Sequence, residues 1–361
     1  MIKIGLVGLG KMGMSHHAIF NSHPDLKVVA ACESSSYVNE VLSKYSGLKC
    51  YSDYDKLIAN EQLDAVVIST PSKLHASMVE TAMNRSLDVF CEKPFVLDVA
   101  DGDRLVALAA ERQRVTQVGY HYRFVGAFAE AARLVQAGLL GKVHHLRAEA
   151  HGPVVLRPKG GTWRSAKSEG GGALYDYACH ALDLVNFIHQ VPSAVSGVVR
   201  QGVFSKDVDD EVYCTLHFSD GGSGHLSVNW SDESQRKMST KVTVWGTNGK
   251  LVVDRQEVQI YLRSVPDDDR NGLQQGWNVR YTTDLTQEVW YYLRGEEYSA
   301  QVDYFAKSIA SRRLDGMNSF ASALQADHVV QKILDSASGS VQPAVAAAAT
   351  GSKGLISRIF G

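Results

Sequence analysis

The sequence has little of several features that mark particular classes of protein. Its 361 residues include five cysteines, an odd number without a Cys-x-x-Cys pair, so we expect reduced thiols and a cytoplasmic protein. A formal net charge of −2 gives no basis for a nucleic-acid partner. No apolar run reaches the ~20 residues that cross a bilayer, and no signal peptide precedes the first strand pattern. A globular protein of two domains remains.

A glycine-rich turn is the first informative feature that the sequence does contain. The segment GLGKMG at residues 8–13 follows an apolar strand pattern at 1–7 and precedes a helical pattern that runs to residue 20. Gly8 permits a tight turn, Gly10 lets the backbone approach a pyrophosphate, and Gly13 lets the helix pack close to the strand. This context predicts a dinucleotide site at the helix N-terminus; the alternative is a glycine turn without a ligand.

Glu33 ends the second strand pattern, about 20 residues after the last glycine of the turn, where the dinucleotide fingerprint has a carboxylate. A carboxylate accepts hydrogen bonds from the ribose 2′-OH and repels a 2′-phosphate. Serines follow it and no arginine does. The sequence therefore favours NAD over NADP, although Glu33 could instead cap the next helix.

Strand patterns at 64–68, 87–93 and 115–119 alternate with helical patterns at 73–84, which Ser72 would cap, and 98–111, which predicts a parallel, doubly wound sheet. Ligands bind at the carboxyl edge of such sheets. At this edge we expect the following cofactor contacts: Gly8, Gly10, Lys11, Met12, Gly13, Glu33, Thr70, Pro71, His75, Glu92 and Lys93. For His75, a plain position on a helix face is an equal alternative. Lys93 precedes a proline, which favours an extended backbone at the lysine.

The pattern changes after residue 123. A helix at 127–136 is followed by period-two segments with hairpin turn signals, which predicts an α+β domain with a large, mainly antiparallel sheet. The segments lie at 143–150, 212–218, 224–230, 241–245 and 258–262. We expect a dinucleotide-binding domain at 1–123, a substrate and oligomerisation domain at 124–338, and a flexible tail at 339–361. The tail's end, 352–361, is amphipathic and could touch a membrane weakly, or be disordered or docked on a partner.

A cluster of titratable residues follows three glycines at 170–172. Asp176 and His180 are four residues apart and would share one face of a helix, with Asp183 close to it. Imidazole is suited to take a proton at neutral pH, and a carboxylate one turn away could orient it. We predict no metal, because neither a cysteine nor a second histidine joins the cluster. A polar face in contact with solvent is the alternative.

These motifs, in this order, resemble those of the glucose–fructose oxidoreductase, inositol dehydrogenase and rhizopine-catabolism (Gfo/Idh/MocA) family. The resemblance rests on residues 8–13, on Thr70-Pro71 with His75, on Glu92-Lys93-Pro94, on Tyr122-Arg123, on Trp163-Arg164, on the three glycines, and on Asp176 with His180. It implies a Rossmann domain followed by an α/β domain whose open sheet commonly forms a dimer or tetramer. Ala178 departs from the glycine that the family often has two residues before the histidine.

The resemblance implies hydride transfer between NAD(H) and a C–OH or C=O group of a sugar, polyol or nucleotide sugar. His180 would act as the base, Lys93 would stabilise the reacting oxygen, and Asp176 would orient His180 or hold a substrate hydroxyl. The expected substrate-binding residues are Tyr122, Arg123, Trp163, Arg164, Asp176 and His180. The alternative is a regulatory family member that binds ligands without catalysis.

The expected substrate could carry a nucleotide diphosphate, as in a UDP-sugar, because the C-terminal half has several cations among aromatic residues. Scattered surface charges are the alternative explanation. The cations are Arg236, Lys237, Arg255, Arg263, Arg280 and Arg294.

Overall fold

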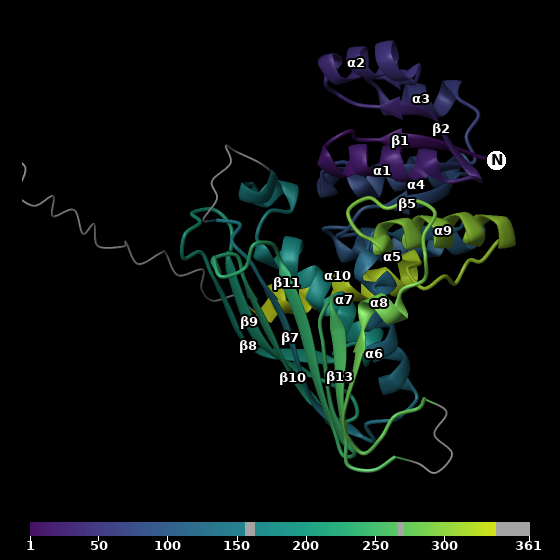
Figure 1. The fold of residues 1–361 in the computed structure, drawn as a ribbon. Helices are drawn as coiled ribbons and strands as arrows, with labels where there is room; N and C mark the ends of the chain where they lie inside the picture. The colour runs from purple at the N-terminus through teal and green to yellow at the C-terminus, as the bar shows by residue number, and fades with distance from the viewer. Residues whose placement is uncertain (156–162, 266–270, 337–361) are drawn as a thin grey trace, which may run out of the picture.

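The first of two sheets is parallel and six-stranded, with the order β3-β2-β1-β4-β5-β6. The computed structural model describes residues 1–155, 163–265 and 271–336 (Figure 1). The strands are β1 (Ile2–Val7), β2 (Leu26–Cys32), β3 (Lys49–Tyr51), β4 (Ala65–Ile68), β5 (Asp88–Cys91) and β6 (Thr116–Val118). The intervening helices are α1 (Lys11–Ser22), α2 (Ser36–Ser46), α3 (Tyr54–Asn60), α4 (His75–Asn84) and α5 (Val99–Glu111). The predicted Rossmann architecture is confirmed.

The strand order reverses between β1 and β4. Folds of this kind bind ligands in the crevice just outside the carboxyl ends of the two strands at such a reversal. The prediction that Ser72 caps the following helix is wrong. Residues Ser72–Leu74 form a 3₁₀ turn, and α4 begins only at His75, without a side-chain cap. The turn forms because the backbone N–H of Leu74 donates to the carbonyl oxygen of Pro71.

The second sheet has eight strands in the order β14-β13-β12-β11-β7-β10-β9-β8. It is antiparallel except between β7 and β10. Its strands are β7 (Val143–His151), β8 (Ala194–Gln201), β9 (Glu211–His217), β10 (Ser223–Asn229), β11 (Ser239–Gly246), β12 (Gly249–Val253), β13 (Glu257–Leu262) and β14 (Gly276–Tyr281). The five predicted strands are present, and the predicted mainly antiparallel sheet is confirmed.

Three strands of this sheet escaped prediction. The strand β8 is interrupted at Gly197, where φ is +60° and the register with β9 shifts, so its side chains do not alternate cleanly. Its residues are mostly half-exposed or exposed, as expected of an edge strand. The strand β14 forms the opposite edge, and β12 is only five residues long. An edge strand pairs with one neighbouring strand instead of two, and its sequence shows a weaker apolar pattern.

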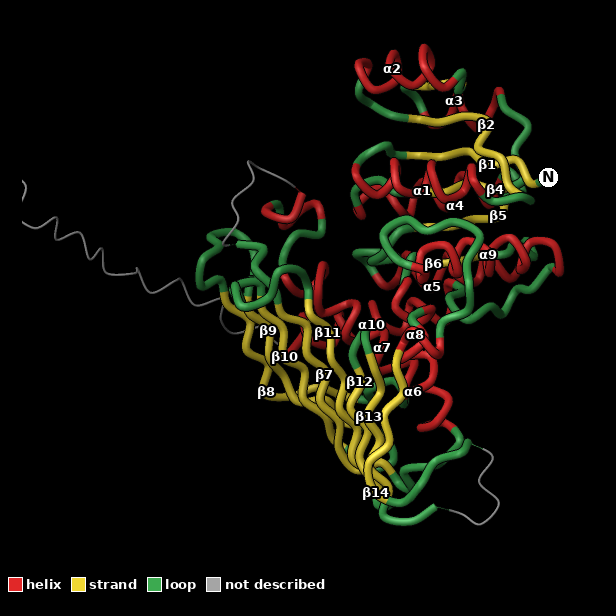
Figure 2. Tube along the Cα trace, viewed as in Figure 1, coloured by secondary structure: helices red, strands yellow, loops and turns green. Residues whose placement is uncertain are grey.

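One face of the second sheet packs against helices α6 (Gly126–Gln136) and α7 (Cys179–Ile188) (Figure 2). A π-helical segment, Leu174–Ala178, leads directly into α7. The other face presents aromatic side chains to solvent near the β14 edge, where Trp277 is 54% exposed and Tyr281 is 53% exposed.

The C-terminal helices pack against the first domain. The predicted division of the chain at residue 123 assigned them wholly to the second domain. Phe305 of α9 (Glu296–Ser311) packs edge-to-face against Phe20 and Phe90, with ring centroids 6.4 and 5.8 Å apart. Helix α10 (Phe320–Ser336) packs against α5 and α7, and so joins the two domains. A short helix, α8 (Thr282–Leu285), precedes them.

Among the described residues, no helix has both the length and the apolar character needed to cross a membrane. The predicted flexible tail at 339–361, with its amphipathic end at 352–361, lies outside the described residues.

Candidate active site

The glycine turn has the geometry that its three positions require. Gly8 has φ of +83°, and a Cβ there would lie 2.8 Å from the carbonyl oxygen of Ser69 at the end of β4. A Cβ at Gly13 would lie 1.8 Å from the carbonyl oxygen of Gly8, whereas a Cβ at Gly10 would meet nothing within 4 Å. Gly8 and Gly13 are therefore needed for the fold, and Gly10 leaves open space in front of the turn.

Helix α1 begins in this open space with Gly10 at its N-cap, and no side chain caps it. Its first N–H groups are thus available to a phosphate. Lys11 beside them is exposed, while Met12 packs against the apolar cluster that contains Ile4 and Phe20.

Glu33 is fixed beside this turn. Its carboxylate accepts hydrogen bonds from the backbone N–H of Leu9 at 2.7 Å and of Ser35 at 3.0 Å, and from the Ser34 hydroxyl at 3.0 Å. Burial alone would raise the pKa of Glu33, but these hydrogen bonds outweigh it, and the pKa is lowered. The cap of α2 is Ser35 rather than Glu33. An open glycine turn, an uncapped helix and an ionised carboxylate fit the pyrophosphate and ribose of NAD.

Glu92 follows β5 and is held by a histidine that sequence reasoning missed. Nε2 of His16 lies 2.6 Å from Oε1 of Glu92, and the His16 side chain is fully buried. A Cβ at Gly119 would lie 3.0 Å from the Glu92 carboxylate, so the glycine makes room for it. Burial would raise the pKa of Glu92, but His16 and Lys93 lower it. The signal for His16 was its place on the buried face of α1, three residues after Gly13.

Lys93 reaches across to the second domain. Its Nζ donates to the backbone carbonyl and to Oδ1 of Asp176, both at 3.0 Å, and its peptide bond to Pro94 is cis. Burial alone would lower the pKa of Lys93, but the Asp176 carboxylate outweighs burial, and the pKa is raised. Lys93 is therefore a protonated hydrogen-bond donor at neutral pH.

Asp176 does not pair with His180, which corrects the prediction that it orients that ring. It lies in the π-helical segment, and its carboxylate binds Lys93 through Oδ1 and the Nε of Arg164 through Oδ2, the latter at 2.7 Å. Burial would raise the pKa of Asp176, but the two cations lower it. Asp176 pairs with the charged Lys93 and Arg164, which are distant in sequence, because charge-assisted hydrogen bonds are stronger than one to the neutral His180 four residues along the helix.

His180 lies next to this ion-paired group in a largely aromatic environment. It is 4% exposed, and its buried Nδ1 has no hydrogen-bond partner among the described residues. The rings of Tyr120, His121 and Tyr122 surround it at centroid distances of 6.0, 5.3 and 5.1 Å. Burial lowers the pKa of His180 well below 6.5, and the charge of Lys93 lowers it further. At neutral pH the ring is uncharged and can accept a proton.

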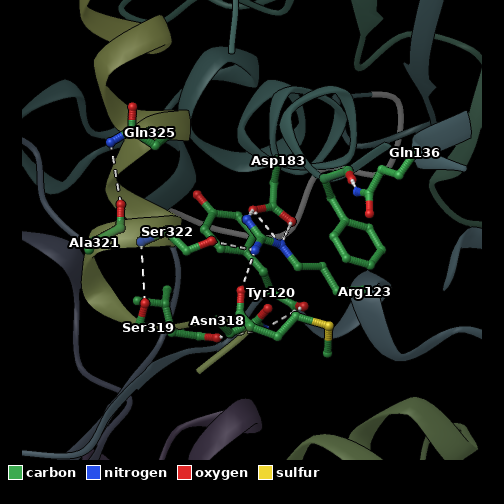
Figure 3. Close-up of polar contacts among 12 residues, drawn as sticks. Tyr120, Arg123, Gln136, Asp183, Asn318, Ser319, Ala321, Ser322 and Gln325 are labelled. Atoms are coloured by element: carbon green, nitrogen blue, oxygen red, sulfur yellow. Dashed lines mark hydrogen bonds and ion pairs between the residues drawn. The ribbon is translucent and has the colours of Figure 1, made fainter. Parts of the chain in front are cut away.

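Arg123 lies in the core, which corrects its prediction as a substrate-binding residue. It is 4% exposed, and its Nη2 lies 2.5 Å from Oδ1 of Asp183 (Figure 3). Its Nη1 donates to the carbonyl oxygen of Met317 at 2.5 Å and to the Ser322 hydroxyl at 2.7 Å. The arginine therefore ties α7 to α10. Burial raises the pKa of Asp183 even though Arg123 opposes it.

His75 is also internal. Its ring has no exposed surface, and its Nδ1 lies 3.0 Å from the carbonyl oxygen of Pro94 while its Nε2 lies 3.1 Å from that of Thr70. The ring thus joins the turns that follow β4 and β5, and supports the cofactor side of the site from behind. Pro71, which follows Thr70 after β4, is exposed.

The other predicted pocket residues divide into two kinds. Tyr122 is 2% exposed and lies behind His180 rather than at the surface of a pocket. Trp163 and Arg164 are half-buried at the rim, where the guanidinium lies 4.8 Å from the tryptophan ring centroid. No group of three potential metal-ligating side chains occurs among residues 1–155, 163–265 and 271–336.

Two family models match this chain. Residues 2–120 match the model described as "Oxidoreductase family, NAD-binding Rossmann fold", and residues 128–252 match the "GFO/IDH/MocA C-terminal domain". The chain belongs to the Gfo/Idh/MocA family. It is therefore an NAD-dependent oxidoreductase, which confirms the family, enzyme class and cofactor predicted from the sequence.

Relatives within the Gfo/Idh/MocA family are moderately similar. Rhizopine catabolism protein MocA of Rhizobium meliloti is 30% identical over 233 residues, which cover 63% of this chain and 70% of the relative. A 2,7-anhydro-N-acetylneuraminate hydratase of Mediterraneibacter gnavus is 26% identical over 286 residues, 75% of each chain. A structure of levoglucosan dehydrogenase with NADH and levoglucosan superposes with a TM-score of 0.81 at 23% identity, covering 93% of this chain and 97% of that one. This last likeness shows the shared fold.

Proposed function

We propose that this oxidoreductase transfers a hydride between NAD(H) and a carbon that carries a hydroxyl group in a small sugar or polyol. The observation that carries the proposal is the meeting of Lys93 from the first domain with Asp176 and His180 from the second. Lys93 is a charged donor that binds Asp176, and its charge also acts on the neutral imidazole of His180. Lys93 follows a strand at the sheet edge where the cofactor's binding turn opens. The names of two relatives, a hydratase of an anhydro sugar derivative and levoglucosan dehydrogenase, support a sugar-like substrate.

In the oxidative direction, a ring nitrogen of His180 takes the proton of the substrate hydroxyl. Lys93 donates a hydrogen bond to the same oxygen and stabilises the negative charge that develops on it. Asp176 keeps Lys93 protonated and in place. NAD, when bound, accepts the hydride that leaves the carbon. The oxygen and carbon thus lose one proton and one hydride, which leaves a carbonyl product.

The structure supports a small substrate better than a nucleotide sugar. Of the cations that could receive a diphosphate, Arg255 pairs with Glu297 at 2.5 Å, and Arg280 pairs with Glu130. These arginines are already neutralised by partners within the protein. We therefore propose a free sugar or polyol rather than a UDP-sugar.

The proposal is tested with Lys93→Met and His180→Asn, assayed for NAD reduction with a panel of sugars and polyols. Each substitution should lower kcat/KM by about 10²- to 10⁴-fold, while NAD binding measured by calorimetry should be retained. Lys307→Met removes a lysine that is 75% exposed on α9, and should retain full turnover. Retained turnover in either site variant would refute the assignment. Binding of NAD without turnover of any substrate would favour the regulatory alternative.

We also propose that the open face of the second sheet forms a homodimer or homotetramer interface. Trp277 and Tyr281, which are exposed on this face near the β14 edge, would be covered by a second copy of the chain. Aromatic residues are enriched in such interfaces. Trp277→Glu should shift the mass measured by light scattering toward the monomer. An unchanged mass in a folded variant would exclude β14 from the interface.

A further inference from the structure

Arg164 is only partly engaged by the protein. Its Nε donates to Asp176 at 2.7 Å, while Nη1 and Nη2 have no hydrogen-bond partner within the described ranges 1–155, 163–265 and 271–336. The side chain is 42% exposed, so part of the guanidinium is accessible to solvent. The face of the group is covered by the Trp163 ring, 4.8 Å away. The free edge is therefore a pair of N–H donors with a fixed plane.

The three glycines hold the backbone of this arginine. The N–H of Gly172 donates to the carbonyl oxygen of Arg164 at 3.1 Å. A Cβ at Gly171 would lie 2.4 Å from the same oxygen, and Gly172 has φ of +109°. The glycine tract is thus required where the chain folds back on Arg164. Together with the ion pair to Asp176, this contact fixes the guanidinium before any substrate arrives.

The carboxylates of the site do not reach the outer edge of Arg164. Lys93 and Arg164 share the carboxylate of Asp176 through Nζ and Nε, and the second carboxylate near Lys93, that of Glu92, is held by His16. His180 and His121 add no positive charge, because burial keeps His180 neutral and lowers the pKa of His121 to about 3. An anionic group of a substrate could therefore pair with this outer edge.

We propose that Arg164 receives a carboxylate of the substrate through its two free terminal nitrogens, so that the substrate is a sugar acid. This inference rests on the proposed function and specifies its substrate class. A planar carboxylate matches the guanidinium fork in geometry and carries a charge opposite to that of Arg164.

The test compares hexuronates with the neutral hexoses of the same configuration, and with hexose 6-phosphates, as substrates for NAD reduction. The wild-type protein should have a higher kcat/KM for the uronates. Arg164→Gln should lower the ratio of uronate to hexose kcat/KM by about 10- to 100-fold, and Arg164→Lys should lower it less, because it retains the charge but loses the fork. Arg104→Gln, on the exposed surface of α5, should leave both values unchanged.

A purely structural role of Arg164 would lower both kcat/KM values equally and leave their ratio unchanged, which would overturn the inference. A preference for hexoses or hexose phosphates in the wild-type protein would overturn it as well, while the proposed function would stand. If neither sugars nor sugar acids are oxidised although NAD binds, the proposed function itself fails. Raising the salt concentration should increase KM for the uronates alone.

Discussion

Asp327 of α10 is a buried carboxyl group that makes stability depend on pH. It is 3% exposed, its Oδ2 accepts a hydrogen bond from the backbone N–H of Val96 at 3.2 Å, and its Oδ1 has no partner among the described residues. Burial raises the pKa of Asp327 from 3.8 to about 8, and the charge of Asp183 adds to the rise. The native protein therefore holds this proton through most of the neutral range.

The sign of the effect follows from this difference in pKa. Between pH 3.8 and about 8, the unfolded chain releases a proton that the native state retains, so the free energy of unfolding falls as pH rises. At 1.36 kcal/mol for each pH unit, the full loss is about 6 kcal/mol, reached above pH 8. The fall between pH 5 and pH 8.5 is about 4 kcal/mol by the same relation.

The substitution Asp327→Asn keeps an oxygen for Val96 but cannot ionise. Its stabilising effect relative to the wild type should be about 4 kcal/mol larger at pH 8.5 than at pH 5, measured by urea unfolding at both values. Asp284→Asn, at an exposed position of α8, should have the same small effect at both. An effect of Asp327→Asn that is equal at the two pH values, or larger at pH 5, would refute the reasoning.

Three further predictions concern the framework of the site. Gly13→Ala should prevent folding or lower Tm strongly, because its Cβ would lie 1.8 Å from a backbone oxygen, whereas Gly10→Ala should fold normally and bind NAD less tightly by calorimetry. Arg123→Gln leaves a buried carboxylate unpaired and should cost about 3–5 kcal/mol in denaturant unfolding. His16→Phe should weaken NAD binding by about tenfold in fluorescence titrations, since it releases Glu92 near the cofactor turn; unchanged binding would show that Glu92 needs no partner.

The cofactor side of the site was largely predictable from the sequence, because its geometry is local. The roles of Gly8, Gly10 and Gly13 depend on the backbone of one turn, and Glu33 sits at the end of the neighbouring strand. Periodicity likewise located five of the six parallel strands and five strands of the second sheet, but it missed β3, which is only three residues long. It also missed the edge strand β8, in which a register shift breaks the alternation.

The substrate side was less predictable, because partners distant in sequence decide where its charges point. Arg123 meets a carboxylate 60 residues away, and Lys93 meets Asp176 at a separation of 83. Helical spacing suggested instead that Asp176 would turn toward His180, four residues along. No local pattern in the sequence shows which cation will pair with a given carboxylate, because the pairing depends on how the two domains pack together.

A continuous series of polar contacts links the cofactor helix to the entrance of the site. It runs from His16 on α1 to Glu92, whose neighbour Lys93 binds Asp176, which in turn binds Arg164. Lys93 and Arg164 each pair with the carboxylate of Asp176, which comes from another element. Asp176 of the second domain raises the pKa of Lys93 against the effect of burial, so the lysine that we propose as catalytic has its charged partner only in the assembled chain. The same carboxylate is shared with Arg164, and hence the catalytic role that we propose for Lys93 and the recognition that we propose for Arg164 both depend on Asp176.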